Sequence, residues 1–307
     1  MTAITPERAG APTPDIPPVS GGPWYRWQRG VPIVKQLPFV LLLTFFSILF
    51  TYPFVWLLSA SLKPRADVFN NLLIPTHWRF YNYVEIWHAA PFLRWFLNSV
   101  YIDGVAAITV TFASALTAFA FAYFRFPLRN FLFGCVLATM MLPGAVTMIP
   151  VYLIWYHLGM SSSQFPLWAT NLFGSAFYIF LQRQFFLGIP RELFEAARID
   201  GDNYWTMFWR IAVPLAKPAL IVTALFEFQA SWTDLLRPLI YLRSDAGFTI
   251  PRGLYALLGQ YSPSAGGHGD YQIIIAAMVL ATLPMIVIFF LGQRYFVEGI
   301  ATQGRKG

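Results

Sequence analysis

The chain has few of the residue types on which metal sites and disulfide scaffolds depend. Only 11% of its 307 residues are charged, and it contains four histidines and one cysteine. A single cysteine excludes a disulfide framework within the chain. The histidines, which are His77, His88, His157 and His268, do not show the spacing of metal ligands. We therefore expect no metal site and no resident cofactor.

A nucleotide-binding loop is also missing. No glycine is followed by lysine anywhere in the chain, so the Gly-x-x-x-x-Gly-Lys-Ser/Thr loop that cradles nucleotide phosphates does not occur. No nucleophile and base stand at a spacing typical of a catalytic pair. We predict a non-catalytic protein, and if ATP drives it, the ATPase is a separate subunit.

What the chain has in abundance is apolar side chains, which make up 57% of its residues. This composition is typical of membrane proteins. The net charge of +7 would suggest nucleic acid as the partner of a soluble domain. Here the basic residues are spread between the apolar runs, so orientation in a lipid bilayer explains them better than nucleic acid does.

The apolar runs predict an all-α membrane protein with six transmembrane helices within residues 31–307. A span takes about 20 helical residues, and six stretches are long enough: 37–62, 96–124, 131–156, 166–187, 218–242 and 272–292. Prolines inside spans bend or break helices, and we expect a break in the third span around Pro143-Gly144. Residues 1–30 are rich in proline and predict a disordered cytoplasmic tail.

Lysine and arginine set the orientation of the spans. With the N-terminus inside, the inner segments hold 14 of these residues and the outer loops hold six, while Arg237 falls within the fifth span. Positive residues concentrate on the cytoplasmic side of membrane proteins. We therefore expect both termini in the cytoplasm.

The longest charged interruption lies between the fourth and fifth spans, at residues 185–218. Pro190 suits the start of a helix, the run Arg191 to Ile199 suits its body, and Asp200-Gly201 suits its end. Asp202 or Asn203 can cap a second helix. Ala196 and Ala197 have small side chains on one side of this helix, so another protein could approach the backbone closely there. The alternative is an amphipathic loop that only faces solvent.

Polar residues within the fourth and fifth spans are candidates for a substrate path, because such residues tend to face a cavity or a partner. Helical spacing places one set on a face of the fourth span and another on a face of the fifth. The candidates are Asn171, Ser175, Tyr178, Glu227, Ser231, Trp232 and Asp234. Asp234 and Arg237 can pair across one helical turn. The alternative role for each residue is hydrogen bonding between the helices of the protein itself.

Several motifs resemble those of permease subunits of carbohydrate ABC importers of the maltose-transporter type. Glu195-Ala196-Ala197, Asp200-Gly201, Ile211 and Pro214 resemble the EAA loop of such permeases, although Val213 stands where Leu is usual and Asp202 where a small residue is usual. Further similar stretches include Ser61-Leu62-Lys63-Pro64, Ser231-Trp232-Thr233-Asp234 and the C-terminal residues 293–307. The resemblance covers about residues 37–307.

This resemblance implies a role in a larger complex of the bacterial cell membrane. The partners would be a second, homologous permease subunit, two copies of an ABC ATPase and an extracytoplasmic sugar-binding protein, which the outer loop 243–271 would reach. The mechanism would be alternating access, in which ATP binding moves a cytoplasmic coupling helix between the fourth and fifth spans. The residues that would couple to the ATPase are Glu195, Ala196, Ala197, Arg198, Asp200 and Gly201.

An ion-coupled secondary carrier that works without an ATPase is the alternative function. Such a carrier predicts paired acids or bases within its spans and often a repeat between its two halves. Glu227 and Asp234 are the only candidates for such a pair, and the sequence shows no such repeat. A membrane-embedded enzyme is a third possible function, but the sequence shows no set of catalytic residues for it.

Overall fold

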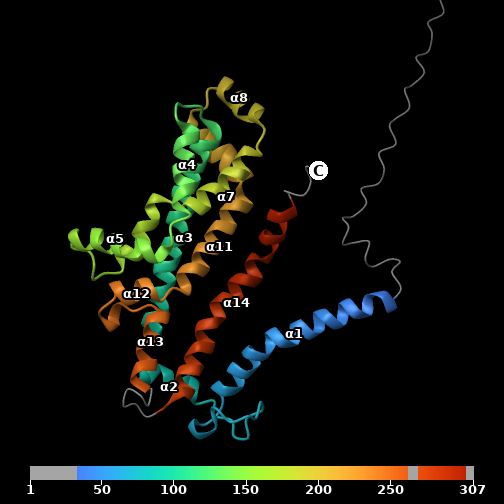
Figure 1. The fold of residues 1–307 in the computed structure, drawn as a ribbon, viewed down its shortest axis with the longest axis vertical. Coiled ribbons are helices and arrows are strands. Elements are labelled where there is room, and N and C mark those ends of the chain that lie inside the picture. The colour runs from blue at the N-terminus through green and yellow to red at the C-terminus, as the bar shows by residue number, and fades with distance from the viewer. Residues whose placement is uncertain (1–32, 262–268, 302–307) are drawn as a thin grey trace, which may run out of the picture. The chain divides into compact units, whose positions relative to one another are not determined.

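The structure is a computed structural model that describes residues 33–261 and 269–301, with side chains for 37–261 and 269–293. The described residues form helices joined by turns and loops, without a strand (Figure 1). The expected tail, residues 1–30, and most of the tip of the outer loop lie outside the described residues. The chain divides into two units, residues 1–55 and 56–307, and each is described by itself.

The elements follow one another in chain order with these bounds: α1 (Ile33–Ser61), η2 (Arg65–Asp67), α2 (Asn82–Ala89), α3 (Phe92–Tyr123), α4 (Arg129–Thr139), α5 (Gly144–His157), α6 (Phe165–Ala169), η3 (Thr170–Phe173), α7 (Ala176–Leu187), α8 (Arg191–Ile199), α9 (Tyr204–Met207), η4 (Phe208–Ala212), α10 (Val213–Leu215), α11 (Lys217–Trp232), α12 (Leu236–Tyr241), η5 (Asp245–Gly247), α13 (Ile250–Tyr261) and α14 (Tyr271–Ala301).

The first unit contains the larger part of α1. From Leu37 to Ser61 this helix carries no charged residue, and its length and hydropathy suffice to cross a membrane. A helix that is apolar on all sides suits a hydrocarbon environment.

The second unit is organised around α3, a helix of 32 residues. Helices α7 and α11 both pack along α3, α14 packs against α11, and α13 packs against α3 and α14 (Figure 1). Where α13 crosses α3, Gly253 faces the ring of Trp95 so closely that a Cβ at this position would lie 2.1 Å from the Trp95 Cε3 atom. The glycine therefore sets the distance between these two helices.

Three of the six expected spans are single long helices of suitable hydropathy: Leu37–Ser61, Phe92–Tyr123 and Tyr271–Gln293. Two bent helix pairs meet the same criteria, which brings the count to five if each pair is one span. The expectation of six spans thus stays a prediction.

The third expected span is broken where the sequence predicts it. Helices α4 and α5 meet at an angle of 100°, and residues 140–143 separate them. Pro143 precedes the first residue of α5. A proline removes a backbone donor and clashes with the preceding turn, so that α4 cannot continue through this position.

The fourth expected span is not one continuous helix. It consists of α6, the short turn η3 and α7, which has 12 residues. Gly174 separates η3 from α7 with φ +75°, a left-handed conformation that glycine adopts without strain. A Cβ here would lie 3.3 Å from Ser114 Oγ of α3, so the glycine also lets the chain approach α3 closely.

The loop that follows α1 is ordered by a buried lysine. Lys63 is fully buried, and its Nζ donates to Asn70 Oδ1 at 2.8 Å and to the Leu72 carbonyl at 2.6 Å. Asn82 Nδ2 donates to the carbonyls of Ser61 and Lys63 and closes the loop. Lys63 therefore fixes the loop and does not act as a surface charge.

Candidate functional site

The first candidate site is α8, the nine-residue helix between α7 and α9. It has the bounds Arg191–Ile199 that the sequence predicts. Glu192 lies in its first turn and Arg198 in its last, which matches the polarity of the helix dipole. The Phe194 ring lies 5.0 Å from the Tyr123 ring and 5.9 Å from the Phe119 ring of α3. These aromatic contacts hold α8 on the end of α3.

The end of α8 is a Schellman motif. Gly201 has φ +89°, its N–H donates to the Arg198 carbonyl at 3.1 Å, and the Asp202 N–H donates to the Ala197 carbonyl at 2.9 Å. This is the hydrogen-bond pattern that closes a helix with a left-handed residue. Asn203 then caps α9, because its Oδ1 accepts from the Thr206 N–H at 2.9 Å. The predicted helix, turn and second helix are therefore present, with Asn203 as the cap.

The two alanines of α8 face in different directions. Ala196 is exposed, whereas Ala197 is only 9% exposed and belongs to the cluster formed with Phe119 and Phe194. The expectation that both alanines keep an open side for another protein is thus wrong for Ala197, because it packs on α3. Ile199 is 87% exposed, which is unusual for an isoleucine.

The remaining predicted coupling residues lie on the surface. Glu195, Arg198, Asp200 and Gly201 are all exposed. The Arg198 guanidinium lies 5.7 Å from the centre of the Tyr204 ring, so it leans on the next helix. Figure 1 shows α8 at one end of the second unit, beyond the ends of α3 and α7. Its outer face is thus largely exposed in the described part of the chain.

The segment after α9 departs from regular α-helical geometry, and its proline accounts for the departure. Residues 208–212 form a π-helical turn directly before α10, which contains Pro214. The proline ring clashes with the carbonyl four residues earlier in an α-helix, and a wider turn relieves that clash. A bend of 78° at Ala216 then leads into α11.

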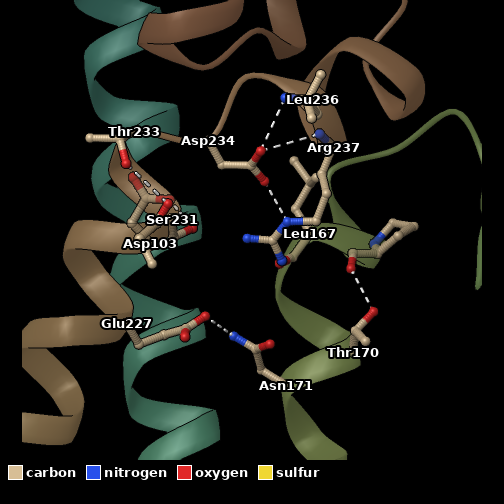
Figure 2. Close-up of polar contacts among 12 residues, drawn as sticks. Asp103, Leu167, Thr170, Asn171, Glu227, Ser231, Thr233, Asp234, Leu236 and Arg237 are labelled. Carbon is tan, nitrogen blue, oxygen red and sulfur yellow. Dashed lines mark hydrogen bonds and ion pairs between the residues drawn. The ribbon is translucent and has the colours of Figure 1, made fainter. Parts of the chain in front are cut away.

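The second candidate site is a group of polar side chains between α3, the α6–η3 segment and α11 (Figure 2). Asn171 Nδ2 donates to Glu227 Oε1 at 2.6 Å and to the Ala106 carbonyl of α3 at 3.3 Å. Glu227 is only 9% exposed. This contact joins three elements, and Tyr178 of α7 is buried beside the same carboxylate.

Asp103 of α3 belongs to this group, although it is not among the path residues predicted from the sequence. Asp103 is 2% exposed, and its Oδ1 accepts from Ser231 Oγ at 2.5 Å. Its other oxygen, Oδ2, has no hydrogen-bond partner within the described residues. The sequence does contain a signal for this residue, because Asp103 is the only charged residue between 96 and 124. Charged residues within spans tend to mark functional positions.

Asp234 pairs with Arg237 as predicted, but it does not share a helical face with Glu227 and Ser231. Helix α11 ends at Trp232, and Asp234 lies in the turn before α12. Its Oδ1 accepts from the Leu236 N–H at 3.0 Å and its Oδ2 contacts Arg237 Nε (Figure 2). The carboxylate accepts from backbone N–H groups at the start of α12, outside α11, so the expected i, i+4, i+7 face is wrong for Asp234.

The other predicted path residues are held within the chain. Trp232 is 4% exposed, donates from Nε1 to the Ala281 carbonyl at 3.1 Å and stacks on Phe228. The backbone N–H of Ser175 donates to Ser114 Oγ at 3.1 Å. Because Gly174 breaks the helix, Asn171 and Ser175 do not continue the face of Tyr178, which corrects that expectation.

The site chemistry is hydrogen bonding and charge pairing. Within residues 37–261 and 269–293, no group of three or more His, Cys, Asp or Glu side chains is arranged to hold a metal ion. The single cysteine, Cys135, is exposed on α4. The arrangement can tie helices together and offer polar groups along them.

Comparison with known proteins gives a consistent result. The family described as binding-protein-dependent transport system inner membrane component matches residues 110–302. The arabinooligosaccharides transport system permease protein AraQ of Bacillus subtilis is 33% identical over 89% of this chain and 97% of its own. The sn-glycerol-3-phosphate transport system permease protein UgpE of Yersinia enterocolitica is 36% identical over 74% of this chain and 82% of its own.

A solved structure shows the same fold. The crystal structure of a bacterial ABC transporter involved in the import of the acidic polysaccharide alginate contains a chain that matches with a TM-score of 0.74. The alignment covers 86% of this chain and 96% of that chain, at 24% sequence identity.

Proposed function

The chain belongs to the family of inner membrane components of binding-protein-dependent transport systems, and from this premise we propose that it imports sugars as one permease subunit of an ATP-driven transporter. The family match over residues 110–302 carries this proposal. The relatives named above transport arabinooligosaccharides or sn-glycerol-3-phosphate. These names cover a carbohydrate and a polyol phosphate, so we propose a sugar or a related polyol phosphate as the substrate class.

An ion-coupled secondary carrier is not favoured. That alternative was based on Glu227 and Asp234, and these two acids do not pair with each other but contact Asn171 and Arg237. The family match in addition points to a transporter with a separate binding protein. The chain itself is then a non-catalytic subunit.

Helix α8 is the contact that we assign to the ATPase. Its inner face is fixed on α3 by Phe194, and its end is closed by the Schellman motif at Gly201. Its outer face presents Glu195, Ala196 and Ile199 to the surroundings. A short helix that is rigid on one side and open on the other can pass a displacement from a partner to α3. Arg198, Asp200 and Gly201 shape the same surface, while Ala197 supports it from inside.

The polar group between α3, η3 and α11 is assigned to the wall of the transport path. Asn171, Ser175, Tyr178, Glu227, Ser231 and Trp232 make contacts within the chain, so their first role is to hold the wall together. Asp234 is in a different position, because it lies in a turn at the end of α11 and its side chain is 18% exposed. We assign to the Asp234–Arg237 pair the contact with a polar solute.

The complex that this function requires contains more than one chain. A second, homologous permease subunit would complete the path, two ATPase subunits would supply the energy, and an extracytoplasmic binding protein would deliver the sugar. The membrane would hold the assembly with both termini and α8 in the cytoplasm. The family description, the apolar spans and the charge distribution support this placement.

Reconstitution in lipid vesicles tests the proposed function. We expect the complete complex to accumulate sugar only when ATP is present on the side of the ATPase subunits and the binding protein on the other. The chain alone, under an ion gradient, should give no uptake. Uptake by the chain alone would support the secondary carrier and overturn the proposal.

A further inference from the structure

A hollow lined by three arginines lies between the α3–α4 turn, the start of α4 and the start of α8. Its volume is about 430 Å³. Arg125 lies in the turn between α3 and α4, Arg129 is the first residue of α4, and Arg191 is the first residue of α8. Apolar and amide side chains complete the lining: Phe126, Leu128, Asn130 and Phe131.

The three guanidinium groups are not neutralised by the described part of the chain. No carboxylate is among the residues that line the hollow. The ion pairs found among the described residues engage other arginines: Arg65, Arg79, Arg210 and Arg237. Arg129 donates from Nη1 to the Phe124 carbonyl at 3.3 Å, so one of the three is already held in place. Three uncompensated charges around one hollow form a site for an anion.

The chemistry favours a phosphate group. Guanidinium presents several N–H donors in a fork that matches the oxygens of phosphate. Two helices, α4 and α8, also begin at the hollow. The first backbone N–H groups of a helix lack partners within the helix and carry partial positive charge. These donors add to the arginines.

The walls of the hollow favour a lipid over a water-soluble phosphate. Leu128 is 69% exposed and Phe131 is 66% exposed, both next to the arginines. Apolar rings and chains beside cations are suited to the boundary between headgroups and hydrocarbon. Basic pockets at the cytoplasmic ends of membrane helices are known to bind anionic headgroups. Leu128 also has φ +62°, a strained conformation for a leucine that turns the chain around the hollow.

From this arrangement we propose that Arg125, Arg129 and Arg191 bind the phosphate headgroup of an anionic phospholipid. The headgroup would connect the α3–α4 turn with the N-terminal end of α8. A lipid at this position would steady the helix that we assign to the ATPase. The inference needs only that this turn lies at a membrane surface, so it can fail or hold independently of the sugar transported.

Lipid retention by the full chain in its purified complex tests the proposal. The complex is exchanged into mixed vesicles of phosphatidylglycerol and phosphatidylcholine, extracted, and its bound lipid counted by mass spectrometry. We expect the wild type to retain phosphatidylglycerol in preference to phosphatidylcholine. The double variant Arg125→Gln, Arg191→Gln should bind it about tenfold or more weakly, since each basic residue near a membrane contributes about 1 kcal/mol.

Matched variants make the result specific. Arg94→Gln with Arg243→Gln removes two exposed arginines from elsewhere and should leave retention unchanged. Arg125→Lys with Arg191→Lys keeps the charges and should keep most of the preference. If the double Gln variant does not assemble, the single variant Arg125→Gln replaces it, because that side chain is exposed.

Three results would overturn the proposal. One is equal retention of phosphatidylglycerol by the wild type and the Gln variants. Another is displacement of the lipid by millimolar inorganic phosphate, which would identify a site for soluble phosphate. The third is loss of the ATPase subunit from the Gln variant with unchanged lipid, which would make the hollow a contact for an acidic protein side chain.

Discussion

Asn171 and Glu227 are joined by a hydrogen bond of 2.6 Å, which connects the turn η3 to the middle of α11. Asn171 reaches the Ala106 carbonyl of α3 with the same amide nitrogen. One side chain therefore links three elements of the second unit. Its partner is a carboxylate that is almost completely buried, where an unsatisfied polar group is costly.

We predict that Glu227→Leu lowers the stability of the assembled complex by about 1–3 kcal/mol, because it removes the closer of the two acceptors of the Asn171 amide. Glu227→Gln keeps an oxygen in the same place and should assemble like the wild type. Thermal unfolding of the purified complex measures the difference. Equal melting temperatures for the Leu and Gln variants would contradict the structural role of this bond.

Asp234→Asn is expected to lower sugar uptake without lowering the amount of complex. The amide keeps the oxygen that accepts from the Leu236 N–H, so the start of α12 survives, but the charge opposite Arg237 is lost. Uptake in vesicles, divided by the amount of complex recovered, gives the readout. Glu85→Gln is the control, since it removes an exposed pair with Arg79 and should leave uptake unchanged. A proportional loss of complex in Asp234→Asn would assign the pair to assembly instead.

Gly201→Val should weaken the coupling of ATP hydrolysis to transport. A left-handed conformation costs a residue with a Cβ about 1–2 kcal/mol, and a β-branched side chain is especially unfavourable there. No heavy atom lies within 4 Å of a Cβ at this position, so the cost is strain in the Schellman turn and not a clash. Asn tolerates this conformation, and Gly201→Asn should retain most of the uptake per ATP hydrolysed. If the Val and Asn variants behaved identically, the turn would not matter for coupling.

Gly253→Ala is predicted to destabilise the protein, because the added Cβ would overlap the Trp95 ring. Forcing extra atoms into a packed contact typically costs about 1–3 kcal/mol, and Trp95 is held by its bond to the Asp245 carbonyl. Gly259→Ala lies on the same helix with open space around it and serves as the control. Thermal melting of both variants checks the prediction, which would be wrong if Gly253→Ala melted at or above the temperature of the control.

Local signals in the sequence predict α8 well. Pro190, Glu192 and the Asp200-Gly201 pair determine where this helix begins and ends, and each acts through its immediate neighbours. The burial of Ala197 could not be predicted in the same way. It depends on the aromatic residues of α3, which lie more than 70 positions earlier in the chain.

The broken spans show where helical periodicity is not sufficient. The apolar stretches continue on both sides of Gly174 and Asp234. The mean hydropathy of a window therefore does not detect the helix breaks at these two positions. At Gly174 the backbone is left-handed and Ser114 lies close to where a Cβ would be, and both conditions favour glycine. At Asp234 the side chain bonds to the backbone of the next turn, and Pro238 disfavours a continuous helix through this carbonyl. Both causes are tertiary or stereochemical and do not change the hydropathy.

Asp103 could have been found from the sequence by a simpler criterion. An ionised side chain at the centre of a span costs about 2.5–3.5 kcal/mol on insertion scales, so a single acid in a long apolar run requires a reason. Its partner Ser231 is 128 residues away. The existence of a site at Asp103 was thus predictable, and the identity of the partner was not.

The central claim is that α8 faces the cytoplasm and contacts the ATPase. Since the chain has one cysteine, Cys135→Ser gives a background in which Ala196→Cys carries the only thiol. We predict that this thiol crosslinks to the ATPase subunit in the assembled complex and resists a membrane-impermeant thiol reagent added outside intact cells, whereas Arg94→Cys in the same background reacts with it. Labelling of Ala196→Cys from outside, without a crosslink to the ATPase, would contradict the account.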